Sequence, residues 1–102
     1  MLTNLRSYDL AVQFYKACKT IRLPYYMKNQ LLRAAASVTL NIAEGSAKSS
    51  KADQKRFYEI SLGSLRETQA VFHMEPNACK DLIPLADRLG ANLFCLVRSL
   101  ER

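Results

Sequence analysis

Apolar residues recur every three or four positions through four long stretches of this chain, and polar breaks separate the stretches. Spacing of this kind places the apolar side chains on one face of an α-helix. The chain has only three glycines and three prolines, too few for the many turns of a β-sandwich or barrel. The sequence therefore predicts an all-α protein in which each helix buries one face against the others.

Polar breaks and prolines set the boundaries of the expected helices. Pro24 ends the first helix, because a proline ring disfavours helical geometry at the residue before it. Ser49 or Ser50 is the expected N-cap of the third helix, and Pro76 ends or kinks that helix. The expected ranges are 4 or 7 to 23, 27 to 48 with Tyr25 and Tyr26 in the turn before it, 51 to 74, and a fourth from the turn at Pro84 to Leu100. Short connections predict one antiparallel, up-and-down four-helix bundle over residues 1–102.

Small residues predict where the helices approach one another closely. The run 34–37 would let a neighbouring helix pack tightly, because the distance between helix axes follows side-chain size. Gly45, Gly63 and Gly90 stand inside helical patterns, where a glycine costs about 1 kcal/mol, so close packing is the expected reason. The expected core stripe of the third helix is Phe57, Ile60, Ser64, Val71 and Met74, with Ser61, Leu65, Thr68 and Phe72 adjoining it.

The balance of charge points to anionic partners. Lys and Arg total 15 against 9 Asp and Glu, a net charge of +6, which favours nucleic acid or an acidic protein; an ordinary solvated surface is the alternative. No apolar run approaches the roughly 20 residues that span a bilayer, and the first residues lack the apolar region of a signal peptide. Cys18, Cys79 and Cys95 include no C-x-x-C pair, which disfavours disulfide frameworks and zinc sites. Reduced cysteines in a cytoplasmic protein are therefore expected.

Basic residues gather in two clusters that we interpret as a candidate nucleic-acid surface. The first consists of Lys16, Lys19, Arg22 and Lys28, and the second of Lys48, Lys51 and Lys55. Contacts to phosphates do not read bases, so the expected binding is weakly sequence-specific. Tyr25 and Tyr26, beside the first cluster, are either base-stacking residues or packing residues at a helix junction.

Two segments carry a more specific pattern. The first comprises Gln30–Ala35, Ser37–Val38 and Asn41–Gly45, and the second comprises Arg56–Phe57, Ile60 and Gly63–Glu67. Together they resemble the small four-helix-bundle proteins encoded in intervening sequences of 23S ribosomal RNA genes. That family is similar to the accessory variability determinant of diversity-generating retroelements. Thr39 and Leu40 stand where the family often carries a proline or a small polar residue.

The resemblance implies a left-handed antiparallel bundle that assembles into a ring, typically a homopentamer. The retroelement relatives bind nucleic acid and a reverse transcriptase through basic surfaces, so these partners are implied as well. The intervening-sequence members have no established enzymatic activity. We therefore expect a non-enzymatic protein with no cofactor, no metal and no membrane partner, and docking of an acidic protein is the alternative function.

Polar residues of the two segments are interpreted mainly as structural. A polar row runs along the second helix at spacings of four, four and three: Arg33, Ser37, Asn41 and Glu44. A carboxylate buried there would need a partner such as Arg33 or Arg56, because unpaired burial costs several kcal/mol. The expected structural network consists of Arg33, Asn41, Glu44, Arg56 and Glu67.

An enzymatic alternative rests on Arg66 and His73, which six residues separate. This spacing resembles the R-x(4–6)-H element of helical ribonucleases that work as dimers. In such enzymes a histidine acts as general base while an arginine stabilises phosphate charge. Spacing this loose is common by chance, and the sequence shows no Ser/His/Asp set, Gly-rich phosphate loop or cluster of metal ligands. We therefore expect no catalytic residue.

Overall fold

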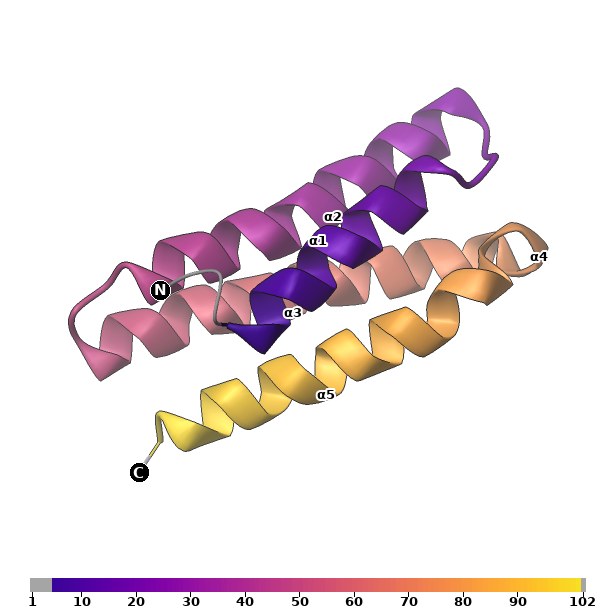
Figure 1. Cartoon of the computed structure of the whole chain (residues 1–102). Coiled ribbons are helices and arrows are strands. Elements are labelled where there is room, and N and C mark those ends of the chain that lie inside the picture. The colour runs from indigo at the N-terminus through magenta and orange to yellow at the C-terminus, as the bar shows by residue number, and fades with distance from the viewer. Residues whose placement is uncertain (1–4, 102) are drawn as a thin grey trace.

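A computed structural model describes residues 5–101 of the chain. Asn4, the earlier of the two predicted starts of the first helix, lies outside the described residues. The described part contains helices and no strand (Figure 1). The elements are α1 (Arg6–Lys19), α2 (Tyr25–Ser46), α3 (Lys51–Met74), α4 (Pro76–Cys79), the 3-10 turn η2 (Lys80–Leu82) and α5 (Ile83–Ser99).

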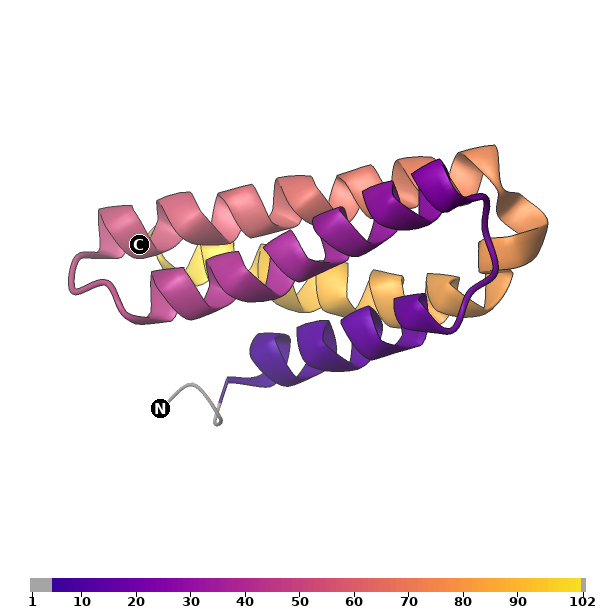
Figure 2. The same cartoon turned by 90° about the horizontal axis from the view of Figure 1, so that it is seen from above.

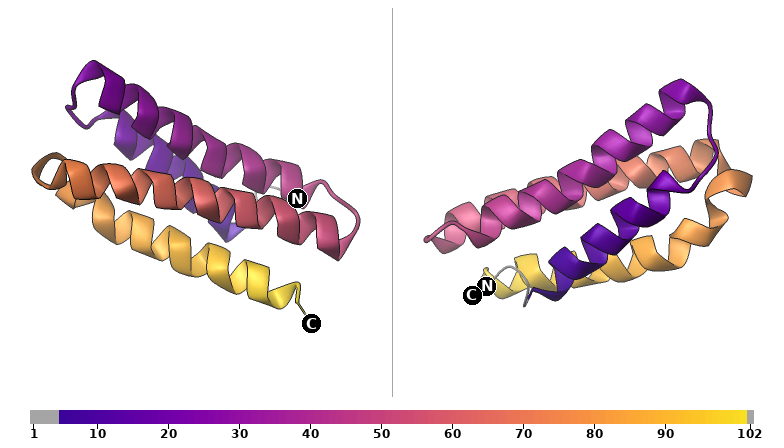
Figure 3. Two further views of the ribbon diagram at one scale, coloured as in Figure 1. Left: turned by 180° about the vertical axis from the view of Figure 1, so that it is seen from behind. Right: turned by 45° about the horizontal axis from the view of Figure 1, so that its top comes forward.

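The four long helices α1, α2, α3 and α5 run alternately up and down a bundle that measures 40 × 20 × 18 Å (Figures 1 and 2). α1 lies beside α2 and α5, and α3 lies beside the same two helices, so the bundle has four sides (Figure 3). α4 and η2 form the corner between α3 and α5. The predicted all-α four-helix bundle is thereby confirmed. None of the helices among residues 5–101 is long and apolar enough to cross a bilayer.

The first connection differs from its prediction. α1 ends at Lys19, not at residue 23, because the chain must turn back before Pro24 to lay α2 against α1. Pro24 has extended backbone angles and directly precedes α2. Tyr25 and Tyr26 therefore lie in the first helical turn of α2, although we expected them in the loop before it. α2 also ends two residues earlier than predicted, at Ser46.

The third helix matches its predicted range, Lys51–Met74. Ser50 is its N-cap, since the Ser50 hydroxyl accepts a hydrogen bond of 3.1 Å from the backbone N–H of Asp53. The last helix has its proline in the first turn, as expected for Pro84, where the missing N–H leaves no intrahelical bond unmade. Local signals thus placed the later boundaries well.

A continuous core lies between the four helices. Phe14 of α1 and Phe72 of α3 meet edge to face there, with ring centroids 6.2 Å apart. Burying a large apolar side chain stabilises the fold by about 1.5–3 kcal/mol. The largest fully buried apolar side chains are Phe14, Leu31, Ile42, Leu65, Leu89 and Leu93.

The predicted core stripe of α3 is partly wrong. Ile60 is 43% exposed and Met74 is 58% exposed. The core side instead carries the residues that we expected only to adjoin the stripe, together with Tyr58: Tyr58, Ser61, Leu65, Thr68 and Phe72. The reason is that α2 packs so close that small hydroxyl side chains, not large apolar ones, fill the contact between the two helices.

The three glycines have different surroundings. A Cβ atom added at Gly45 would lie 2.7 Å from Cε1 of Tyr58, so α2 and α3 can meet there only with a glycine. At Gly90 an added Cβ would lie 3.4 Å from Cδ2 of Leu65, which is ordinary contact. At Gly63 it would meet nothing within 4 Å. The close contact expected at Gly63 is therefore not made within the chain.

Candidate nucleic-acid interface

Positive charge is concentrated in one continuous run of the chain. Residues 10–43 contain five basic residues and no acidic one. Outside this run, the remaining ten basic residues face all nine acidic residues, so the run carries five of the six net positive charges. The run covers the second half of α1, the α1–α2 loop and most of α2. Its basic members are Lys16, Lys19, Arg22, Lys28 and Arg33.

The first predicted cluster sits at the end of the bundle where this run turns from α1 into α2 (Figure 1). Lys16, Lys19 and Arg22 are all exposed there. Tyr25 and Tyr26 begin α2 immediately afterwards and are 82% and 71% exposed. Of the two interpretations of these tyrosines, packing at the junction is therefore wrong. This corner presents cations and bare aromatic rings together, which is the combination that binds single-stranded nucleic acid.

Lys28 differs from the other members of the first cluster. Its side chain is half-buried, and its Nζ donates hydrogen bonds to the carbonyl oxygens of Lys19, at 3.0 Å, and Ile21. These carbonyls belong to the end of α1 and the loop that follows, so Lys28 holds the loop against the start of α2. A cation beside the last carbonyls of a helix also interacts favourably with the helix dipole. We therefore assign Lys28 to the support of the surface.

Acidic partners compensate most of the second predicted cluster. Lys48 Nζ lies 3.1 Å from a carboxylate oxygen of Glu44 and 5.2 Å from the ring centroid of Phe57. Lys55 Nζ lies 3.9 Å from Glu59 and 3.5 Å from Glu101. Lys51 is exposed and makes no ion pair among residues 5–101. This cluster therefore offers less net charge to a phosphate than the first.

The polar row on α2 makes a hydrogen-bonded contact with α3. Asn41 Nδ2 donates to the carbonyl oxygen of Ser37 at 2.9 Å and to its hydroxyl at 3.1 Å. The Ser37 hydroxyl in turn lies 2.7 Å from that of Ser64. The buried Ser61 hydroxyl donates to the carbonyl oxygen of Val38 at 2.8 Å. Only Asn41 among the five predicted network residues takes part, and the serines of α3 that complete the contact were missed because we assigned them to an apolar stripe.

The other four predicted network residues do not join this contact. Glu44 has a side chain 54% exposed and pairs with Lys48, not with Arg33 or Arg56. Arg56 lies 4.0 Å from Asp53 and stacks 4.5 Å from the ring centroid of Phe57. Arg33 and Glu67 line one small hollow of about 170 Å³ beside Ser37 and Ser64. A surface pair such as Glu44–Lys48 contributes only about 0.3–0.5 kcal/mol, so Glu44 stabilises the fold little.

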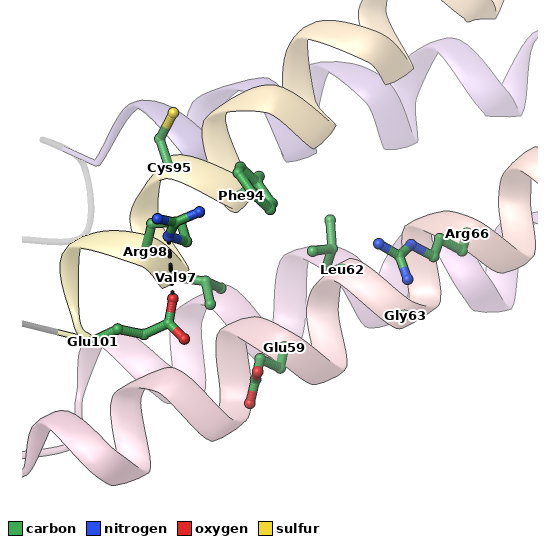
Figure 4. A pocket seen from close by; sticks show the side chains of 9 residues that line it. All are labelled: Glu59, Leu62, Gly63, Arg66, Phe94, Cys95, Val97, Arg98 and Glu101. Atoms are coloured by element: carbon green, nitrogen blue, oxygen red, sulfur yellow. Dashed lines mark ion pairs between the residues drawn. The ribbon is translucent and has the colours of Figure 1, made fainter.

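Arg66 and His73, which formed the enzymatic alternative, line different hollows. Arg66 borders a groove of about 1000 Å³ between α3 and α5 (Figure 4). His73 borders a second hollow of about 490 Å³ near the α3–α5 corner, with Asp87 and Ile83. Both side chains are exposed. Within the described part of the chain, no group of three or more His, Cys, Asp or Glu residues is placed to hold a metal ion.

Comparison with protein families gives one match. The family model of the 23S rRNA-intervening sequence protein matches residues 4–78, which is well over half of the chain. The match includes α1, α2 and α3, and with them the basic run and both segments of the sequence pattern. A search of curated proteins found no match.

Proposed function

Because this chain belongs to the 23S rRNA-intervening sequence protein family, we propose that it is a non-enzymatic scaffold or accessory protein that binds nucleic acid with low sequence specificity. The observation that carries the proposal is the run of residues 10–43, with five basic residues and no acidic one. Uncompensated positive charge attracts a polyanion at long range and releases counterions when phosphates bind.

The corner between α1 and α2 supports single strands as the preferred ligand. Lys16, Lys19 and Arg22 supply cations for phosphates, while Tyr25 and Tyr26 present faces on which unpaired bases can stack. Stacking is possible with every base, so this chemistry binds without reading a sequence. A duplex would offer only its phosphates to the same corner, because its bases are already stacked on one another.

The proposal includes assembly of the chain into a homo-oligomeric ring, with five copies as the expected number. A small bundle of this size has a modest core, and association adds buried surface. A ring would also repeat the basic corner, so that individually weak contacts to one long strand act together. The second candidate function uses the same surface: the basic corner would dock an acidic protein partner, such as a reverse transcriptase, in place of nucleic acid.

A salt titration with labelled single-stranded RNA tests the proposal. We expect the logarithm of the affinity to fall linearly with the logarithm of the salt concentration. Replacing Lys19 and Arg22 together by alanine should reduce that slope by about 1.4, which is about 0.7 for each lost phosphate contact on a single strand. The matched control replaces Lys48 and Lys55, whose charges are already paired, and should leave the slope nearly unchanged.

A second measurement separates stacking from charge. Replacing Tyr25 and Tyr26 by alanine should weaken single-stranded RNA binding by about 1–3 kcal/mol for each lost stacking contact while the salt slope stays the same. Affinity that is independent of salt, or that falls equally in the control variant, would rule out this surface. Absence of RNA binding together with salt-dependent binding of an acidic protein would favour the second candidate function.

A further inference from the structure

We propose that two adjoining faces of the bundle, both built on α3, join copies of this chain head to tail. The first, the seam face, is the outer side of the α2–α3 contact and carries Leu40 and Ile60. The second, the α3–α5 groove, is lined by Leu62, Gly63, Arg66 and Phe94 among others. The occupant of the groove is the seam face of a second copy. This inference rests on the ring included in the proposed function and names its contact surfaces.

The seam face exposes apolar side chains that the chain itself does not cover. Leu40 is 66% exposed and Ile60 is 43% exposed. The hydrogen bond from the Ser61 hydroxyl to the carbonyl of Val38, and the contact of Ser37 with Ser64, set α2 against α3. In that register Leu40 and Ile60 lie at the same level of the bundle, on either side of the seam. Together they form a low apolar ridge.

The α3–α5 groove offers an apolar floor at the same level. Leu62 of α3 and Phe94 of α5 both line it, and Figure 4 shows them projecting into the space between the two helices. Phe94 is 51% exposed although it is a large aromatic residue. Leu62 follows Ile60 by only two residues on α3, so ridge and floor differ in height by about 3 Å along the helix axis. A rotation about an axis parallel to the bundle would bring them together.

Gly63 lies between the two faces and has no packing partner in its own chain. An added Cβ at this position meets nothing within 4 Å, in contrast to 2.7 Å at Gly45. Glycine weakens a helix interior relative to alanine, so the absence of any nearby atom leaves its place in the middle of α3 unexplained within one chain. Close approach of a second copy along the outer side of α3 explains it.

Charge is complementary across the same contact. Arg66 borders the groove, whereas Glu67 borders the small hollow on the α2 side, with Arg33. Neither Arg66 nor Glu67 makes an ion pair among the described residues. Because they are consecutive, they differ in height by about 1.5 Å and project to opposite flanks of α3. In a ring whose axis is parallel to the bundle, Arg66 of each copy therefore meets Glu67 of the next.

The two faces adjoin one another and are different, which decides the type of assembly. A contact between two different surfaces is head to tail and closes into a ring if the rotation permits. Neighbouring sides of a four-helix bundle stand at roughly 90°, close to the interior angles of rings with about four or five copies, about 90° and 108°. The geometry therefore favours a small closed ring over a two-fold dimer.

A charge swap tests the contact, with native mass as the readout. We expect the wild-type chain to form a ring, and Arg66→Glu or Glu67→Arg alone to shift it to the monomer mass of 11.6 kDa. The double variant, Arg66→Glu with Glu67→Arg, should restore the ring because the pair is re-formed with reversed signs. Arg88→Glu is the matched control, since Arg88 is an exposed arginine of α5 outside the lining of the groove, and should keep the ring.

A second variant tests the space at Gly63. Gly63→Phe has room for its side chain in the monomer, so we expect a helical, cooperatively folded chain that does not form rings. Rings that survive both single charge reversals and Gly63→Phe would overturn the proposed faces while leaving the ring itself in place. A wild-type chain that stays monomeric at every concentration would overturn both. RNA binding through Lys19 and Arg22 is measured separately on the monomeric variants, so its failure is distinguishable from either result.

Discussion

The hydroxyl oxygens of Ser37 and Ser64 lie 2.7 Å apart across the contact between α2 and α3. Ser64 is buried, and Asn41 donates a further hydrogen bond to the Ser37 hydroxyl. A hydrogen bond between helices at a buried position contributes about 0.5–1.5 kcal/mol, and removing one partner leaves the other unsatisfied. This pair thus joins the two helices with polar groups at a place where no large side chain fits.

We expect Ser37→Ala and Ser64→Ala each to lower the free energy of unfolding by about 1 kcal/mol. The double variant should lose less than the sum of the two, with a coupling energy of about 0.5–1 kcal/mol, because the second substitution removes a group that the first left unpaired. Urea denaturation of the four proteins measures the cycle. Strictly additive losses would show that the two hydroxyls do not interact.

Gly45→Ala should destabilise the protein although alanine is the better helix former. The new Cβ would lie 2.7 Å from Cε1 of the buried Tyr58 and 3.1 Å from Cβ of Phe57, so the two helices must separate. Overpacking of this kind costs about 1–3 kcal/mol. Gly90→Ala is the control: its Cβ meets only the end of Leu65 at 3.4 Å, and we expect an unchanged or raised melting temperature. Equal melting shifts in the two variants would contradict the close contact at Gly45.

Lys28→Met should lower stability and leave RNA binding nearly intact. The variant keeps the aliphatic part of the side chain but removes the donor to the carbonyls of Lys19 and Ile21. Hydrogen bonds from charged groups contribute about 1.5–3 kcal/mol when they are formed, so we expect a loss of about 1–2 kcal/mol at this half-buried site. Lys16→Met should do the opposite, with little effect on unfolding and a lower salt slope. A Lys28 variant that loses RNA affinity without losing stability would place Lys28 on the binding surface.

The pH dependence of stability should report the buried thiol of Cys18. Burial, and secondarily the neighbouring Cys79, raises the pKa of Cys18 from its ordinary value of 9.0 to about 12, while Lys28 lowers it in part. Between these values the unfolded chain releases the proton and the native chain keeps it. The stabilising contribution is therefore fully present below pH 9.0 and is lost as the pH rises towards 12.

Urea denaturation at several pH values between about 8 and 11 measures this loss. One proton held only by the native state gives a slope of at most about 1.4 kcal/mol per pH unit. Tyr58 contributes in the same direction, because burial raises its pKa too, so the informative quantity is the difference between variants. Cys18→Ala should flatten the slope. Leu10→Ala, which also opens a cavity near the end of the core but removes no titrating group, should keep it. Identical slopes in both variants would contradict a buried, protonated Cys18.

The sequence predicted the helices because helix formation is largely local. Apolar spacing, the N-cap at Ser50 and the prolines all act within a few residues, and they placed α3 and the start of α5 correctly. Boundaries failed where a longer-range contact decides them. α1 stops at Lys19 because Lys28, nine residues later, binds the carbonyls that end it. The core side of α3 also failed, since it depends on how close α2 lies.

The sequence by itself determined that this chain forms four amphipathic helices with an excess of positive charge, because composition and periodicity are properties of single segments. Only the tertiary structure decided which of those charges remain available. Lys55 meets Glu101 from the far end of the chain, while Lys19 and Arg22 turn outward with no acidic residue near them in the sequence. Ion pairs depend on distances in space, and the packing of α3 against α2 and α5 sets those distances.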